Sequence, residues 1–328
     1  MRFYSLPTPE RLVEEAFTYA RRRMPGKRLR TSTIQNRKAK VILKMELFIE
    51  YLDKQLHRMI ISVPTFKDLH PFYQELLPET VNIVKVKQSV SQMVAVRKLL
   101  KKQLVQGRQR MHLTSPDALK QMDKASKSFF GRVANIMDSL GESVAIMNKA
   151  NQLMKEVPDI RTDIPTIVLA GYPNTGKTTL LGRLTGSKAR IASFPFTTKS
   201  LQLGYFQWKY HDIQVIDTPG LLDRPPEKRN PIEKKAMAAL HHVANAILFV
   251  IDPTPTSGYP LAQQHALLMS LQKQFSLPFL LILNKTDAAA PADIKSTKDI
   301  FGDTLIEEGE GIPSPLRERV GKVLGLGV

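Results

Sequence analysis

The residues Gly171 to Thr178 have the types and the spacing of a phosphate-binding loop. They read Gly-Tyr-Pro-Asn-Thr-Gly-Lys-Thr and fit the pattern G-x-x-x-x-G-K-[ST]. An apolar, strand-like run precedes them and a helical stretch follows from Thr179, which is the context that such a loop requires. The glycines let backbone N–H groups point at phosphate oxygens, Lys177 brings charge to the β and γ phosphates, and Thr178 offers a hydroxyl to Mg²⁺. These residues predict a nucleotide site.

Two further motifs follow in order along the chain. Asp217-Thr218-Pro219-Gly220 and Asn284-Lys285-Thr286-Asp287 each end a strand-like run. They resemble the D-x-x-G sensor of metal and γ-phosphate and the N-K-x-D guanine motif of the P-loop GTPases. The resemblance implies that Asp287 accepts hydrogen bonds from guanine N1 and N2, which adenine cannot provide in that arrangement, so GTP is preferred over ATP. It also implies that Lys285 packs along the base and that Asn284 braces the pocket.

The expected site for GTP or GDP draws on all three motifs. Its candidate nucleotide contacts are Gly171, Asn174, Thr175, Gly176, Lys177, Thr178, Thr179, Asp217, Gly220, Asn284, Lys285 and Asp287. The candidates for a catalytic role are Lys177, Thr198, Gly220 and Asn174, and the candidates for binding Mg²⁺ are Thr178, Thr198 and Asp217. Guanine sites are usually completed by a Ser-Ala loop. Residues 304–312 occupy its place without a Ser-Ala pair, so the backbone amide that contacts guanine O6 stays open.

A first switch is expected at residues 194–199, between the phosphate loop and the D-x-x-G motif. Thr198 is the candidate whose hydroxyl and carbonyl close over Mg²⁺ and the γ-phosphate, and its neighbour Thr197 is the alternative. The alternative is that the two threonines have no switch role and only begin a strand over residues 201–206, since threonine favours strands.

Leu221 stands directly after the D-x-x-G motif, where Ras-like enzymes carry a Gln that orients the attacking water. A leucine cannot polarise water, so we expect slow intrinsic hydrolysis unless another group or a partner completes the site. Asn174 is a candidate for that contribution, because related GTPases with a G-x-P-N-x-G-K loop use this asparagine to hold K⁺ near the β and γ phosphates. The alternative is that Asn174 is a turn residue, for which asparagine is well suited.

The periodicity of apolar residues predicts two kinds of structure. The first 160 residues give helical patterns, which predict a bundle with helices over 9–20, 33–59, 84–110 and 115–157. Gly131 and Gly141 could bend the last helix, and residues 63–78, with three prolines, interrupt the pattern. From Ile164, strand-like runs alternate with helical stretches, which predicts a parallel sheet with crossover helices. We therefore expect an α + α/β protein, with a basic N-terminal helical bundle over residues 1–160 and a P-loop GTPase domain with a mostly parallel sheet over residues 161–328.

Composition narrows the class of protein. With 42% hydrophobic and 24% charged residues in 328, and no apolar run longer than a strand, the chain reads as globular and without a membrane span. The absence of cysteine excludes disulfides and thiolate metal sites. No secretory pattern opens the sequence. We expect a cytoplasmic protein.

The net charge of +18 is concentrated in the first half, where residues 1–160 hold 29 Lys and Arg against 15 Asp and Glu. Residues 21–40 and 81–110 contain no acid at all, which predicts contact with a polyanion. Few aromatic residues interleave with these charges, which favours backbone or shape recognition of folded RNA over base stacking. The candidate contacts are Arg21, Arg22, Arg23, Lys27, Arg28, Arg30, Arg37, Lys38, Lys98, Lys101 and Lys102. The alternative is a set of solvated helix faces whose acids lie elsewhere.

The sequence resembles the Nog-type nucleolar GTP-binding proteins, a family within the Obg-related GTPases. The segments that carry the resemblance are 171–179, 196–201, 215–223, 227–233 and His70-Pro71-Phe72-Tyr73. The resemblance implies a role in assembling the large ribosomal subunit, with the subunit precursor, its rRNA and ribosomal proteins as partners. Eukaryotic members continue into a long tail, so we expect a compact, archaeal-like form that does not reside in a nucleolus.

Two other functions are compatible with these residues. The first is a GTP-dependent adaptor that binds protein partners or an anionic membrane and has no RNA role. The second is an RNA-modifying GTPase, which predicts an additional catalytic module that is not visible in the sequence.

Overall fold

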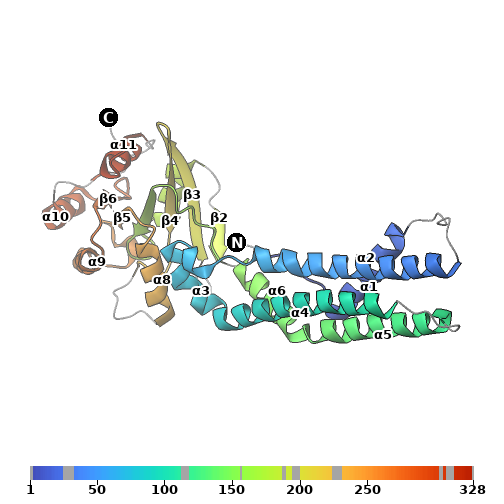
Figure 1. The fold of residues 1–328 in the computed structure, drawn as a ribbon. Coiled ribbons are helices and arrows are strands. Elements are labelled where there is room, and N and C mark those ends of the chain that lie inside the picture. The colour runs from blue at the N-terminus through green and yellow to red at the C-terminus, as the bar shows by residue number, and fades with distance from the viewer. Residues whose placement is uncertain are drawn as a thin grey trace. The chain divides into compact units, whose positions relative to one another are not determined.

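The computed structural model describes residues 3–24, 33–111, 118–155, 157–186, 190–193, 200–223, 231–302, 306–307 and 314–326. The chain forms two compact units, and most of their elements are labelled in Figure 1. The helical unit consists of Met1–Thr65 and Val81–Lys155, and the sheet unit consists of Phe66–Thr80 and Glu156–Val328.

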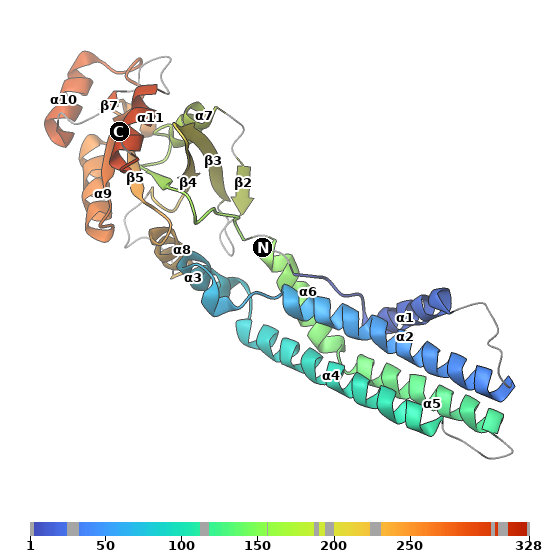
Figure 2. The same cartoon turned by 45° about the horizontal axis from the view of Figure 1, so that its top comes forward.

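The helical unit contains α1 (Pro9–Arg23), α2 (Thr33–Ser62), α4 (Ile83–Arg110), α5 (Ala118–Asp138) and α6 (Gly141–Met154). In α2 the buried side chains of Phe48, Leu52, Leu56 and Met59 recur at spacings of three and four, so they lie along one face of the helix. The long helices α2, α4 and α5 run side by side in Figures 1 and 2 and contact one another. The predicted helical bundle is confirmed.

The last predicted helix is divided into α5 and α6, which Figure 2 shows as separate segments. The break falls at Ser139 and Leu140, directly before Gly141, whereas Gly131 lies inside α5. Gln92 of α4 stabilises the break, because its side-chain amide donates to the Ser139 carbonyl at 2.9 Å and its side-chain oxygen accepts from the Ser143 hydroxyl at 2.6 Å.

The sheet unit has seven strands within the described residues, in the order β2-β3-β4-β1-β5-β6-β7. The strands are β1 (Thr166–Ala170), β2 (Arg190–Ser193), β3 (Ser200–Trp208), β4 (His211–Asp217), β5 (Ala246–Ile251), β6 (Phe279–Leu283) and β7 (Ile306–Glu307). Strands β4, β1, β5, β6 and β7 pair in parallel, while β2–β3 and β3–β4 are antiparallel. The sheet is therefore mostly parallel, as predicted, with an antiparallel edge where two residues, Lys209 and Tyr210, join β3 to β4 without a crossover helix.

Helices cover both faces of this sheet, since every residue of β1 and β5 is buried. The helices of the unit are α3 (Pro71–Thr80), α7 (Lys177–Thr185), α8 (Pro231–His241), α9 (Leu261–Gln274), α10 (Pro291–Phe301) and α11 (Ser314–Val323), with short 3₁₀ turns at Phe66–Asp68 and Pro255–Ser257. Leu180 and Leu184 of α7 and Val320 of α11 form one core with the sheet. Among the described residues, no helix is both long and apolar enough to cross a membrane.

Helix α3 belongs to the sheet unit, although the expected division at residue 160 placed it in the helical half. Phe72 and Leu77 of this helix are completely buried, and α3 contacts α8. The Tyr73 hydroxyl donates to the Ile160 carbonyl at 3.0 Å and accepts from the Ile160 N–H at 3.1 Å. Burial raises the pKa of Tyr73 to about 12. The segment that interrupts the helical pattern thus packs on elements that come much later in the chain.

Candidate nucleotide site

The loop from β1 to α7 needs backbone conformations that only a few residue types adopt. Gly171 has φ 134°, Asn174 has φ 63° and Gly176 has φ 93°, values that favour glycine and, to a lesser extent, asparagine. Space is also restricted, because a Cβ at Gly171 would lie 2.5 Å from the Val250 carbonyl oxygen, and one at Gly176 would overlap the Asn284 side-chain nitrogen. The loop therefore curls tightly before α7 begins at Lys177, and the amides at that helix start can face an anion.

Lys177 turns its side chain back into this curl. Its ammonium group donates to the carbonyl oxygens of Gly171 at 2.9 Å and Tyr172 at 2.6 Å. The residue is only 7% exposed, and burial lowers the pKa of the ammonium group. A phosphate beside it would offset that desolvation, so the position suits a residue that binds phosphate oxygens.

Asp217, at the end of β4, lies beside Thr178 in the first turn of α7. The Thr178 hydroxyl donates to Asp217 Oδ2 at 2.6 Å. Asp217 is fully buried, and this desolvation raises the pKa of its carboxyl group, while Thr178 and Lys177 oppose the shift. Within the described residues its other oxygen, Oδ1, is buried without a hydrogen-bond partner. A hydroxyl and a carboxylate with a free oxygen fit the hard oxygen ligands that Mg²⁺ prefers.

The D-x-x-G motif ends in a turn around Gly220, which has φ 81°. The Gly220 N–H donates to Asp223 Oδ2 at 2.8 Å. Leu221 is 1% exposed, so its side chain is part of the core and does not face solvent. The residue at the position of the Ras glutamine is thus buried as well as apolar.

The N-K-x-D motif is fastened to the phosphate loop by two side chains. The Asn284 amide donates to the Thr175 carbonyl at 2.7 Å. The Lys285 ammonium donates to the Asn174 carbonyl at 2.7 Å. Asp287 follows on the exposed part of the same turn. The structure therefore brings together the phosphate loop and the guanine motif, which are more than a hundred residues apart in the sequence.

Asp252 belongs to this site and was missed from the sequence. It directly follows β5 and is completely buried. Its Oδ2 accepts from the Lys285 ammonium at 2.6 Å, and its Oδ1 accepts from the N–H and the hydroxyl of Thr254 at 2.8 and 2.6 Å. The available signal was a carboxylate placed directly after an apolar strand, because the carboxyl ends of parallel strands line ligand sites.

We predict that Asp252→Asn weakens GDP and GTP binding by about tenfold, the effect of losing one charge-assisted hydrogen bond. The asparagine keeps an acceptor for Thr254 but removes the charge that holds Lys285. Calorimetric titration measures the affinity. Asp212→Asn is the matched control, because Asp212 forms a surface ion pair with Arg161 at 3.1 Å. Equal affinities of the two variants would show that Asp252 does not position Lys285.

Aromatic stacking fixes the second residue of the phosphate loop. The rings of Tyr172 and Tyr259 have centroids 4.1 Å apart and planes inclined by 22°. Tyr259 lies in the loop that follows Asp252. Gln264 stabilises this loop, because its side-chain amide donates to the Asp252 and Tyr259 carbonyls at 2.8 and 2.9 Å. The loop after β5 thus supports the phosphate loop through a ring contact as well as through Lys285.

Two parts of the predicted site lie outside the described residues. They are the first switch with Thr197 and Thr198, and most of the distal loop, of which only Ile306 and Glu307 are described as β7. Thr179 lies in the first turn of α7 and is exposed.

The basic residues of the helical unit divide into paired and unpaired groups. Arg37 forms an ion pair with Asp123 at 2.8 Å, and Lys101 lies 3.9 Å from Asp53. Basic residues of the acid-free blocks thus pair with acids from other helices, as expected if the blocks are solvated helix faces whose acids lie elsewhere. Of the candidate RNA contacts, the described ones that are exposed and form no ion pair are Arg21, Arg22, Arg23, Lys98 and Lys102. Lys38 is partly buried on α2, and Lys27, Arg28 and Arg30 lie outside the described residues.

The structure places the phosphate loop and the guanine motif at one edge of the sheet. The phosphate loop follows β1, Asp217 ends β4, and the guanine motif follows β6. The carboxyl ends of these strands lie at the same edge of the sheet. This order of motifs on a mostly parallel sheet defines the sheet unit as a P-loop GTPase, a protein that binds and hydrolyses GTP.

Comparison with known proteins places the chain more narrowly. Residues 2–161 match the family described as the NOG1 N-terminal helical domain, and residues 166–285 match the family described as 50S ribosome-binding GTPase. An uncharacterized protein of Methanocaldococcus jannaschii is 35% identical over 77% of this chain and 70% of its own length. The chain belongs to the Nog-type family of GTP-binding proteins.

Eukaryotic relatives share the same region. The probable nucleolar GTP-binding protein 1 of Dictyostelium discoideum is 30% identical over 88% of this chain and 43% of its own length. The nucleolar GTP-binding protein 1 of Arabidopsis thaliana is 33% identical over 73% of this chain and 36% of its own length. The chain thus spans less than half the length of these nucleolar relatives. A crystal structure of the putative nucleolar GTP-binding protein 1 from Plasmodium falciparum aligns with a TM-score of 0.43 at 28% identity, covering 52% of this chain and 91% of that chain.

Proposed function

We propose that this GTPase acts as a switch in the assembly of the large ribosomal subunit, in the cytoplasm, and that its helical unit docks on rRNA and ribosomal proteins of the precursor. The observation that carries the proposal is a GTPase joined in one chain to a helical unit with exposed basic side chains at Arg21, Arg22, Arg23, Lys98 and Lys102, which form no ion pair within the described residues. The family descriptions, which name a 50S ribosome-binding GTPase and nucleolar GTP-binding proteins, support the same assignment.

The chemistry at the site is phosphoryl transfer from GTP to water. In our proposal Lys177 and the loop amides stabilise the negative charge that develops on the phosphate oxygens. Thr178, Asp217 and Thr198 would hold Mg²⁺, which would supply positive charge to offset that of the β and γ phosphates. Since Leu221 is buried, no side chain at its position orients the attacking water. Slow intrinsic hydrolysis is the expected consequence.

Potassium is the proposed supplement to this incomplete site, with Asn174 as its ligand. The left-handed conformation of Asn174 also satisfies the turn explanation, so the two explanations need a direct test. Replacing K⁺ by Na⁺ is expected to lower GTP turnover by about tenfold, through lost electrostatic stabilisation of the transition state. Asn174→Gly keeps the backbone conformation and removes the side-chain amide, so this variant is expected to turn over equally slowly in both salts. Equal rates of the unsubstituted protein in K⁺ and Na⁺ would remove the potassium proposal.

Docking is tested by co-sedimentation of the full chain with large ribosomal subunits, in a GTP analogue, in GDP and at rising salt. We expect binding that depends on the nucleotide and that weakens steeply with salt, because binding to RNA releases counterions. Charge reversal at Arg21, Arg22 and Arg23 is expected to lower binding about tenfold or more, since each phosphate contact adds to the affinity. Reversal of Lys120, Lys124 and Lys127 on α5, which are also exposed, is the charge-matched control and should have a smaller effect.

The GTP-dependent adaptor is the competing function, and the same experiment distinguishes it. An adaptor would not sediment with ribosomal subunits in any nucleotide state. Binding to vesicles that contain phosphatidylserine, without binding to subunits, would favour a membrane role instead.

A further inference from the structure

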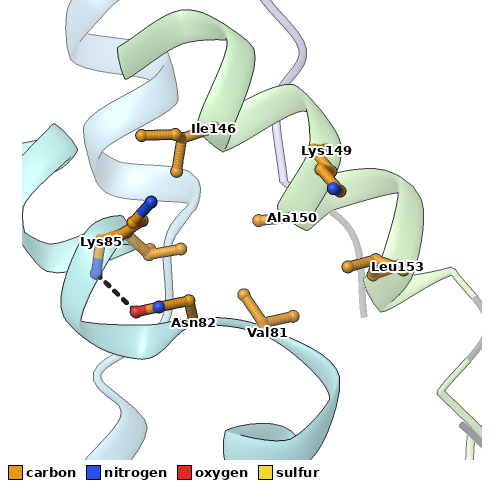
Figure 3. Close-up of a pocket in the computed structure, with 8 residues that line it drawn as sticks. Val81, Asn82, Lys85, Ile146, Lys149, Ala150 and Leu153 are labelled. Carbon is orange, nitrogen blue, oxygen red and sulfur yellow. Dashed lines mark hydrogen bonds between the residues drawn. The ribbon is translucent and has the colours of Figure 1, made fainter. Parts of the chain in front are cut away.

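A hollow of about 390 Å³ lies in the helical unit, between the start of α4 and the second half of α6. Figure 3 shows the side chains around it, which come from these two helices and from Val81 and Asn82 just before α4. The volume is in the range of binding sites that enclose small ligands or a few side chains. None of the described residues that line it belongs to the candidate nucleotide site.

The floor of the hollow is apolar. Val81, Val86 and Ala150 are each at most 3% exposed and form its base. Ile146 and Leu153 of α6 stand at its wall and are half-buried, so part of their apolar surface remains open to solvent. A partner side chain that covers this surface would gain about 25 cal/mol for each Å² removed from water.

The rim of the hollow is positively charged. Lys85 of α4 and Lys149 of α6 are exposed and lie on opposite sides of it, as Figure 3 shows. Neither lysine forms an ion pair within the described residues, and no acid is among the described residues that line the hollow. Asn82 caps α4 by accepting from the Lys85 N–H at 3.0 Å. The positive end of this 28-residue helix therefore adds to the charge of the two lysines.

We propose that the hollow binds a short acidic and apolar segment of a partner protein. An aliphatic or aromatic side chain of the segment occupies the floor, and a neighbouring carboxylate lies between Lys85 and Lys149. The positive charge of the rim favours an acidic partner. The apolar floor favours a protein segment over a polyphosphate, which has no apolar group to cover it. This site goes beyond rRNA docking and does not depend on it.

RNA fits the hollow less well. None of the described lining residues is aromatic, so a base would have no ring on which to stack. A phosphate backbone could contact the two lysines but would leave Leu153 and Ile146 uncovered. The lysines alone would suit RNA, and the apolar floor distinguishes the two classes of partner.

Selection of random peptides displayed on phage against the 328-residue chain tests the proposal. We expect enrichment of peptides that carry a Leu, Phe or Met within two positions of an Asp or Glu. The enriched peptide, made with a fluorescent label, is then titrated by fluorescence polarisation. The double variant Lys85→Glu and Lys149→Glu is expected to lower its affinity by about tenfold or more, given the usual strength of charge-assisted contacts. Leu153→Ser is expected to lower it through loss of the apolar contact.

The control is the double variant Lys87→Glu and Lys127→Glu, which makes the same change in net charge at exposed positions away from the hollow. It should change the peptide affinity less than twofold. Failure to enrich such peptides, or equal losses in the two double variants, would overturn the proposal. The proposal would also fail if the Lys85 and Lys149 reversal weakened binding of a labelled single-stranded RNA as much as binding of the peptide. Thermal unfolding checks that every variant is folded.

Discussion

Asp287→Asn is expected to lower the affinity for GTP by about two orders of magnitude and to raise the affinity for XTP, because each hydrogen bond to a charged group contributes about 1.5–3 kcal/mol. The carboxylate accepts from guanine N1 and N2 in the proposed arrangement. Xanthine carries a carbonyl oxygen at C2, which needs a donor, and the asparagine amide provides one. Asp287 is exposed, and Asn284 and Lys285 hold its turn, so the substitution should not disturb the fold.

Competition of GTP and XTP against a fluorescent guanine nucleotide measures this change. Asp299→Asn on α10 is the matched control, because it removes the same charge from an exposed site away from the motif. Selectivity for GTP that is the same in both variants would refute the role of Asp287 in base recognition.

Gly176→Ala is expected to weaken nucleotide binding by more than about a hundredfold, because the added Cβ both strains the backbone and collides with a neighbouring side chain. The residue has φ 93°, a conformation that an L side chain rarely adopts. Its Cβ would also overlap the Asn284 amide, which donates to the Thr175 carbonyl. Relief of that overlap requires either the phosphate loop or the guanine motif to move.

Gly186→Ala is the control that separates backbone strain from collision. Gly186 follows α7 with φ 62°, and a Cβ there meets no atom within 4 Å among the described residues. Its substitution adds backbone strain of about 1–2 kcal/mol without a collision. We expect calorimetry to show near-normal nucleotide affinity for Gly186→Ala. If Gly176→Ala binds as tightly as this control, close packing against Asn284 is not required for binding.

The nucleotide site could be predicted from the sequence because each motif is local. The residues of the phosphate loop are consecutive, and their need for glycine is a property of their own backbone. The contacts between motifs could not be predicted in this way. Asp252 has no motif around it, and its role depends on Lys285, which reaches it from a neighbouring strand end.

The fold shows the same division between local and distant information. The helices of the helical unit and most strands follow from apolar periodicity. Helix α3 was not predicted, and its placement depends on α8 and Ile160, which no local pattern reveals. Likewise, Asp53 and Asp123 provide acids for blocks that contain none in the sequence. A run of basic residues therefore predicts the charge of its own segment better than the charge of the folded surface, to which acids from other segments contribute.

The insertion of α3 has a consequence for synthesis of the protein. The ribosome produces Phe72 and Leu77 before any residue of α8. The apolar face of α3 therefore stays without its packing partner while the helical unit is completed. The chain also passes between the two units three times, at residues 65–66, 80–81 and 155–156. A single cut near residue 160 would leave α3 without its packing partner, so no one cleavage site releases both units intact.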